Sequence, residues 1–241
     1  MKNSKSFSVN LLIMLFFFTL CSNVIAQKDK NISFQVAPLL SYMHIVYGPY
    51  SNKNLSGVND PQLGFSSTLK FEISHNKTFS INTGLSYQIR NNKYEPGIFI
   101  DTLNTIYDEQ HFPYKSTDCS VSYQFIGVPI GINVNYLNTS KLRIYQSFAT
   151  ELNFLFTARY EGVNYYKGGN TENYNIRHVE GNNKVLFSLT TSIAVCKYLN
   201  ENFALKIEPG INYMANYFRN GTYAKMKFFD LKIDVGLIYK L

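Results

Sequence analysis

The sequence contains no tryptophan, few cysteines and, beyond residue 26, no long apolar run. A membrane-spanning helix needs about 20 predominantly apolar residues, and no segment beyond residue 26 provides them. Long amphipathic helical patterns are absent as well, whereas segments with period-two alternation recur along the chain. These absences exclude a helical membrane protein and predict an all-β chain.

Sequence motifs of the common enzymes are also missing. The chain has no G-x-S-x-G, H-E-x-x-H or P-loop pattern. His44, His75, His111 and His178 are scattered, whereas a Ser-His-Asp site requires a histidine within hydrogen-bond reach of both partners. The sequence therefore predicts no enzymatic activity, no cofactor and no metal. A hydrolase that uses His111 or His178 is the weakest alternative.

The few cysteines do not form a recognisable site. Cys21 lies in the N-terminal segment, and Cys119 and Cys196 show no C-x-x-C spacing of the kind that binds zinc. Their positions in the predicted strands put Cys119 near one end of the structure and Cys196 near the other. We therefore predict no disulfide between them, although an exported pair of cysteines can form one.

The first 26 residues have the pattern of an export signal. Lys2 and Lys5 precede an apolar stretch at residues 11–20, and small residues follow at the expected cleavage site between Ala26 and Gln27. Cleavage leaves 21 basic and 16 acidic side chains, a net charge of +5. A basic balance can indicate nucleic-acid binding, but export and the lack of a basic cluster argue against it. We expect a signal peptide at 1–26 and one domain at 27–241.

Period-two alternation predicts eight strands, each bounded by clusters of Asn, Gly, Asp, Ser or Lys. Their approximate ranges are 32–46, 61–74, 78–91, 120–136, 142–160, 185–199, 203–217 and 226–241.

The connections between these strands alternate in length. Those at 75–77, 137–141 and 199–202 are tight, whereas those at 47–60, 92–119 and 161–184 are long, and 218–225 is intermediate. Outer-membrane barrels have short periplasmic turns and longer extracellular loops. We therefore expect both termini in the periplasm and the long connections outside the cell.

The last strand carries the strongest membrane signal. From Phe228 to Leu241, apolar side chains occupy every second position, so that one face is apolar and the other carries four charges. A soluble β-sandwich or lipocalin-like barrel also alternates. Strands of 14 or more residues exceed the usual length of about 5–6, and 19 Tyr and 19 Phe suit aromatic girdles. These features favour an eight-stranded antiparallel up-and-down transmembrane β-barrel in the bacterial outer membrane.

The same alternation places charged side chains inside the predicted barrel. Seven basic and five acidic residues share this face, and buried charges must pair. An eight-stranded barrel is just wide enough for side chains to fill, which favours a salt-bridged plug over a narrow anion pore. We also expect bulges at Pro38, Pro129 and Pro209. The predicted interior charges are Lys70, Glu72, Arg90, Arg143, Glu151, Arg159, Lys206, Glu208, Asp230, Lys232, Asp234 and Lys240.

The C-terminal residues resemble the assembly signal of bacterial outer-membrane barrels. Asp234, Gly236, Tyr239 and Leu241 match its polar, glycine, aromatic and terminal positions, although the terminal position is more often Phe. The resemblance implies insertion by the barrel-assembly machinery.

Three segments resemble the PorT-like outer-membrane β-barrel family. Residues 64–91 are similar to its glycine-rich hairpin, residues 123–130 to its Y-x-x-I-P strand, and residues 208–213 to a late strand. The resemblance implies an outer-membrane barrel, and one member of the family has been linked to type IX secretion.

The expected function is a non-enzymatic barrel with a structural or surface-binding role that presents loops 92–119 and 161–184. The alternative is a narrow channel or a component of a protein secretion machinery. The expected partners are the lipid bilayer, the barrel-assembly machinery and an extracellular ligand or secretion complex, but no nucleic acid.

Overall fold

The computed structural model describes residues 29–47, 61–94, 114–166, 168–178, 185–220 and 224–241. The predicted signal peptide with its cleavage site at Ala26–Gln27, the predicted loop 47–60 beyond Tyr47 and most of loop 92–119 lie outside these ranges. No helix in the described residues is long and apolar enough to cross a membrane.

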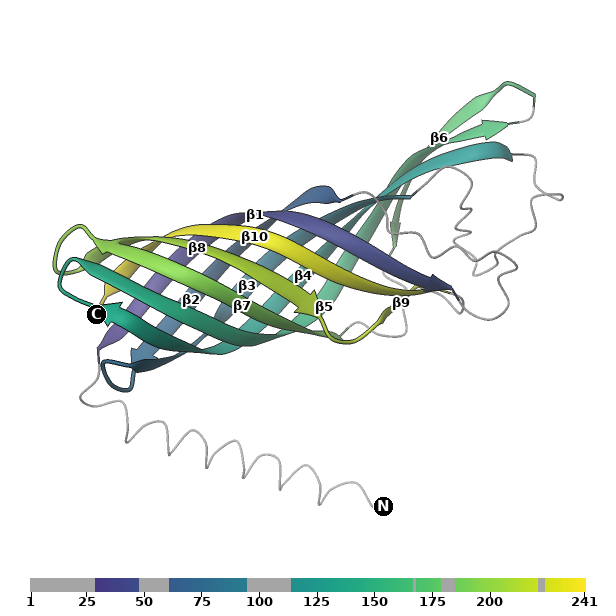
Figure 1. The fold of residues 1–241 in the computed structure, drawn as a ribbon. Helices are drawn as coiled ribbons and strands as arrows, with labels where there is room; N and C mark the ends of the chain where they lie inside the picture. The colour runs from purple at the N-terminus through teal and green to yellow at the C-terminus, as the bar shows by residue number, and fades with distance from the viewer. Residues whose placement is uncertain (1–28, 48–60, 95–113, 167, 179–184, 221–223) are drawn as a thin grey trace, which may run out of the picture.

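The predicted barrel of eight antiparallel strands is confirmed. Each barrel strand pairs with the next, and the first and last strands, β1 and β10, pair with each other and close the sheet. Figure 1 shows the strands tilted around the barrel axis. The barrel strands are β1 (Lys30–Tyr47), β2 (Gln62–Ser74), β3 (Phe79–Tyr94), β4 (Tyr114–Asn138), β5 (Leu142–Tyr166), β7 (Val185–Tyr198), β8 (Phe203–Met214) and β10 (Ala224–Lys240).

The two ends of the barrel differ, and we name them the turn end and the loop end. The turn end contains the C-terminus and the tight connections after β2, β4 and β7 (Figure 1). Two of these turns are organised by one asparagine side chain each. The Oδ1 of Asn76 accepts the amides of Thr78 and Phe79, and the Oδ1 of Asn200 accepts those of Asn202 and Phe203. Such side-chain bonds replace the backbone partners that a sharp turn removes.

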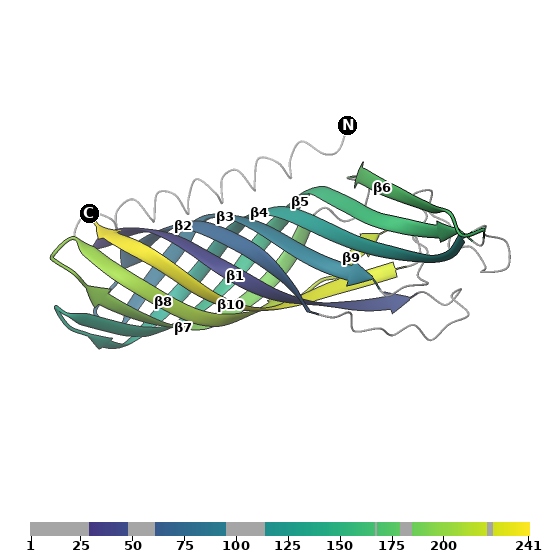
Figure 2. The ribbon, with the colours of Figure 1, turned by 90° about the horizontal axis from the view of Figure 1, so that it is seen from above.

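Two strands continue well beyond the barrel at the loop end. β4 and β5 each contain 25 residues, and β6 (Thr171–His178) pairs with the far end of β5. Figures 1 and 2 show this extension on one side of the barrel. A three-residue strand, β9 (Phe218–Asn220), pairs with β10. We name the extension the distal sheet; it comprises residues 91–94 of β3, 114–123 of β4, 158–166 of β5 and all of β6.

The prediction that residues 161–184 form a loop is wrong for most of that segment. Its Val, Tyr, Thr and Ile residues favour strands, and the segment pairs as a hairpin with a turn at Gly168 and Gly169. Gly169 has a φ of 85°, a left-handed conformation that glycine adopts without steric cost. The sequence signal was present, because the glycine pair separates two segments that can pair with each other.

Contrary to our expectation, no bulge lies at Pro38, Pro129 or Pro209. The register is unchanged on either side of Pro38, Pro129 and Pro209, although one neighbouring strand loses its pairing at each proline. Proline lacks an amide hydrogen and so removes a ladder bond. The surrounding pairs are long enough to hold the register across the gap.

A bulge does lie in β5, where Phe156 is an extra residue. Phe125 pairs with Leu155, whereas the preceding Gln124 pairs with Thr157. Odd-numbered side chains of β5 face inward before this point, and Ala158 and Tyr160 face inward after it. The bulge therefore exchanges the two faces of β5 beyond Phe156.

Candidate functional site

The interior of the barrel contains a balanced set of buried charges, which we name the charge belt. Its five basic and five acidic side chains come from five strands, β2, β3, β5, β8 and β10, and are at most 16% exposed. The residues of the charge belt are Lys70, Glu72, Arg90, Arg143, Glu151, Lys206, Glu208, Asp230, Lys232 and Asp234.

Two predicted interior charges do not belong to the charge belt. Arg159 faces outward because the bulge at Phe156 reverses this part of β5, and its side chain is 53% exposed. Lys240 lies at the turn end, where its Nζ is 3.1 Å from Asp29 Oδ1. Without these two residues the expected excess of basic charge inside the barrel disappears, and this excess was the reason to consider an anion pore.

Most of the charge belt consists of close ion pairs. At the turn end, Arg143 Nη2 lies 2.5 Å from Glu72 Oε1, and its guanidinium stacks 4.4 Å from the ring centre of Tyr145. Next to this pair in the lumen, Glu208 Oε2 lies 2.5 Å from Lys206 Nζ and 3.8 Å from Lys70 Nζ. A third ion pair joins Lys232 Nζ to Asp234 Oδ2 at 2.9 Å.

One ion pair is completely enclosed. Arg90 Nη2 lies 2.9 Å from Asp230 Oδ2, and neither side chain is exposed. Asp230 also accepts hydrogen bonds from Ser41 and Asn212. The guanidinium lies 4.9 Å from the ring centre of Phe125 and 5.4 Å from that of Phe228. Further donors satisfy the carboxylate and aromatic faces cover the cation, as a buried charge requires, although Arg90 Nη1 has no hydrogen-bond acceptor among the described residues.

Glu151 is bound by neutral groups instead of a cation. Ser86 donates to its Oε1, and Gln88 donates to its Oε2 at 2.8 Å. These donors from β3 reach over Gly127 of β4 to Glu151 in β5, where the missing side chain of the glycine leaves room for the contact.

Beyond the charge belt, toward the loop end, an apolar layer fills the lumen. We name it the upper lumen cluster. Tyr123 meets Phe228 edge to face, with ring centres 5.6 Å apart. The cluster contains Met43, Val121, Tyr123, Phe125, Leu155, Ala158, Tyr160, Leu186, Met214, Met226 and Phe228. A layer of this kind excludes water from the space above the ion pairs.

A smaller apolar cluster lies at the turn end and includes the free thiol of Cys196. Cys196 pairs in register with Arg143, whereas Cys119 pairs with Gly162 in the distal sheet. The two cysteines therefore lie toward opposite ends of the molecule.

The predicted assembly residues lie along the closing seam between β1 and β10. Asp234 points inward and belongs to the charge belt, whereas Tyr239 faces outward with its ring centre 5.1 Å from that of Phe203. A Cβ on Gly236 would lie 2.6 Å from Phe34 O, so the close approach of β1 requires glycine. The amide of Leu241 donates to Lys30 O at 2.8 Å and ends the seam.

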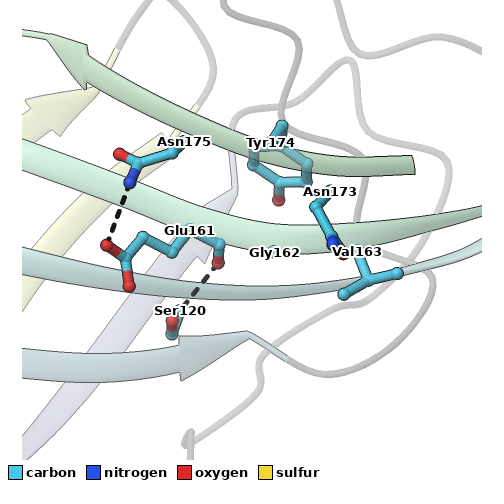
Figure 3. Close-up of a pocket in the computed structure, with 7 residues that line it drawn as sticks. All are labelled: Ser120, Glu161, Gly162, Val163, Asn173, Tyr174 and Asn175. Atoms are coloured by element: carbon cyan, nitrogen blue, oxygen red, sulfur yellow. Dashed lines mark hydrogen bonds between the residues drawn. The ribbon is translucent and has the colours of Figure 1, made fainter.

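The distal sheet bears a surface hollow of about 460 Å³. Figure 3 shows Glu161 at its centre, where Asn175 Nδ2 donates to Glu161 Oε1 at 3.3 Å and Ser120 Oγ donates to Glu161 O at 3.2 Å. Tyr174 lies over Gly162, where a Cβ would come within 2.6 Å of the phenol oxygen. The hollow is lined by Ser120, Glu161, Gly162, Val163, Asn173, Tyr174 and Asn175.

The histidine side chains that the structure describes, those of His44 and His75, do not assemble a catalytic or metal site. His44 lies on the outer face of β1, and His75 lies in a turn. His111 and the side chain of His178 lie outside the described residues. In the described part of the chain, no group of three His, Cys, Asp or Glu side chains is arranged to hold a metal ion.

The outer face of the barrel is apolar along its whole circumference. It exposes large side chains on every barrel strand, among them Leu63, Leu85, Ile130, Phe187 and Ile207. Monomeric soluble proteins rarely expose continuous apolar surface of this extent, whereas transmembrane barrels require it for contact with lipid.

The structure resembles solved outer-membrane proteins. Outer membrane protein OprG from Pseudomonas aeruginosa superposes with a TM-score of 0.56 at 9% identity, covering 89% of this chain and 96% of that chain. Neisserial surface protein A gives a TM-score of 0.43 at 14% identity, with 87% and 97% covered. The outer membrane protease OmpT from Escherichia coli gives 0.47 at 8%, with 88% and 97% covered.

The chain has the fold of outer-membrane β-barrels. At these identities the likeness concerns the fold alone. No protein-family model and no curated protein matches the sequence. The resemblance to the PorT-like family therefore stays a prediction from short motifs.

Proposed function

We propose that this protein is a non-enzymatic barrel of the bacterial outer membrane, which holds the distal sheet at the cell surface as a binding platform. Its lumen serves as a rigid support and not as a passage. The export signal at 1–26 and the assembly signal at the C-terminus would direct it there through the barrel-assembly machinery.

The observation that carries this proposal is the combination of a filled lumen with a long, one-sided extension. The charge belt and the upper lumen cluster occupy the interior in successive layers. The distal sheet continues β4 and β5 well beyond the barrel and bears a polar hollow. Aromatic and amide side chains of the kind found there suit adaptable recognition.

A narrow channel is the second candidate. The many charged side chains inside the barrel support it. Because basic and acidic side chains are equal in number there, the lumen would not select anions over cations. A role in protein secretion is supported only by the PorT-like motifs. A channel would raise the conductance of planar bilayers above the lipid background, which a filled lumen would not do.

The orientation can be tested with variants that carry an inserted cleavage site for a specific protease. The protease is added to intact cells that express these variants, and cleavage of the protein is measured. Insertion between Gly168 and Gly169 should make the protein cleavable from outside, because this turn forms the tip of the distal sheet. The matched insertion after Thr139, in a tight turn of the opposite end, should stay protected until the cells are opened. Protection of the first site together with external cleavage of the second would contradict the proposal.

A further inference from the structure

The outer face of the distal sheet carries two rows of polar side chains. Residues directly opposite on neighbouring antiparallel strands point to the same face, so the register defines each row across β3, β4, β5 and β6. The lower row, nearer the barrel, contains Asn91, Ser122, Arg159 and Arg177, and the upper row contains Lys93, Ser120, Glu161 and Asn175.

These rows begin where the apolar outer face ends. Phe156 is exposed on that face and lies against Tyr87, with ring centres 6.2 Å apart. Arg159 follows three residues later in β5. With a rise of about 3.3 Å per residue and a tilt of about 40°, it lies roughly 8 Å further along the barrel axis. This distance places the lower row at about the level of lipid headgroups, which extend about 5–7 Å beyond the hydrocarbon core on each side, and the upper row lies roughly 5 Å further out.

The charges of this face are not balanced. Arg159 lies 2.7 Å from Glu161, whereas Arg177 donates its Nε hydrogen to Thr157 Oγ1 at 3.1 Å. Among the described residues, neither Arg177 nor Lys93 has a carboxylate partner. Arg159 and Arg177 are also direct cross-strand neighbours, and like charges in such positions destabilise a sheet. An anion between the two guanidinium groups would remove this repulsion.

We propose that the outer face of the distal sheet binds the phosphorylated headgroup of an acylated glycolipid in the outer leaflet. Arg159 and Arg177 hold the phosphate, because guanidinium groups bind phosphate oxygens through paired, charge-assisted hydrogen bonds. The acyl chains then lie along Phe156 and Tyr87, and the polar side chains of the upper row face the sugar. The inference depends on the proposed outer-membrane location.

A lipid suits this face better than a soluble anion does. The two arginines adjoin the apolar face of the barrel, so a ligand that reaches both regions must itself have a charged and an apolar part. Basic side chains next to a membrane attract anionic lipids, with about 1 kcal/mol for each Lys or Arg near the surface.

The test measures the Kd of the purified full-length protein in detergent for three probes. These are a bis-phosphorylated, acylated glucosamine disaccharide, the same lipid without its phosphates, and inorganic phosphate. The phosphorylated lipid should bind at least about tenfold more tightly than the dephosphorylated lipid. The Arg159→Gln/Arg177→Gln double variant should lose about tenfold in affinity, since two charge-assisted contacts are removed.

Two further variants separate binding from folding and from net charge. The Lys141→Gln/Lys197→Gln variant removes two exposed positive charges at the turn end and should bind like the unaltered protein. The Glu161→Gln variant removes the acid that competes for Arg159 and should bind about two- to threefold more tightly. A misfolded protein would not gain affinity.

Equal affinity for the lipid with and without phosphate would overturn the inference. So would an equal loss in the turn-end control, or competition by inorganic phosphate at the same concentration as the lipid. The proposed function would survive these results if the protein still inserted into vesicles and exposed the turn at Gly168. Failure of insertion would instead contradict the proposed function.

Discussion

Two arginine–carboxylate pairs in this protein have nearly the same length but lie in different surroundings. Arg90 and Asp230 are 2.9 Å apart in the lumen, where neither side chain is exposed. Arg159 and Glu161 are 2.7 Å apart on the distal sheet, where the side chains are 53% and 50% exposed. The first pair joins β3 to β10, whereas the second joins two residues of β5.

The comparison shows that solvent access, and not distance, decides what such a pair contributes. A half-exposed pair competes with water and with salt, and contributes about 0–1 kcal/mol. A fully buried pair that loses one partner leaves an uncompensated charge, at a cost of about 3–5 kcal/mol. Loss of one partner of an ion pair therefore destabilises the barrel strongly when the pair lies in the lumen. On the distal sheet an ion pair can be replaced by contacts to a ligand at little cost in stability.

The largest effect is expected for Asp230→Asn. The amide keeps the shape of the side chain but leaves the charge of Arg90 without its partner, between Phe125 and Phe228. The free energy of unfolding of the refolded protein should fall by about 3–5 kcal/mol in urea titrations. Glu201→Gln, in an exposed turn at the turn end, serves as the control and should change it by less than about 0.5 kcal/mol. Equal effects of the two variants would contradict the comparison.

A somewhat smaller effect is expected for Leu186→Ala in the upper lumen cluster. Leu186 is fully buried, and truncation of a buried leucine leaves a cavity that costs about 2–5 kcal/mol. Leu189 lies on the same strand with its side chain on the outer face, where detergent or lipid can fill the space. Leu189→Ala should therefore be the milder variant in the same titration, and the reverse order would contradict the assignment of the two faces.

The smallest effect is expected for Glu161→Gln. Because its partner Arg159 is half exposed, loss of the ion pair should change the free energy of unfolding by no more than about 1 kcal/mol, and less at high salt. A loss comparable with that of Asp230→Asn would show that the distal sheet, like the lumen, depends on its ion pairs for folding.

Much of the barrel could be predicted from the sequence because one rule applies to each strand. Alternation identified all eight barrel strands, and parity assigned inward positions to the residues of the charge belt, from Lys70 to Asp234. The tight turns were readable because Asn76 and Asn200 are residues that organise turns.

Three parts of the prediction failed for physical reasons. Arg159 was assigned to the lumen because parity cannot detect an extra residue, and Phe156 continues the apolar pattern on the outer face. The bulges were expected at prolines, where only a hydrogen bond is lost and the register survives. The pairing of β6 with β5 was also missed, because the polar residues on both sides of Gly168 look like an ordinary loop.

The bulge at Phe156 also restricts how this chain can change in length. Each residue inserted into or deleted from β5 just beyond the barrel moves every following side chain of the strand to the opposite face of the sheet. A change of two residues leaves each side chain on its original face. A change of one residue would move Tyr160 from the lumen to the outer face and Arg159 from the outer face into the lumen. The gene can therefore lengthen or shorten this arm only in even steps, unless a second irregularity restores the phase.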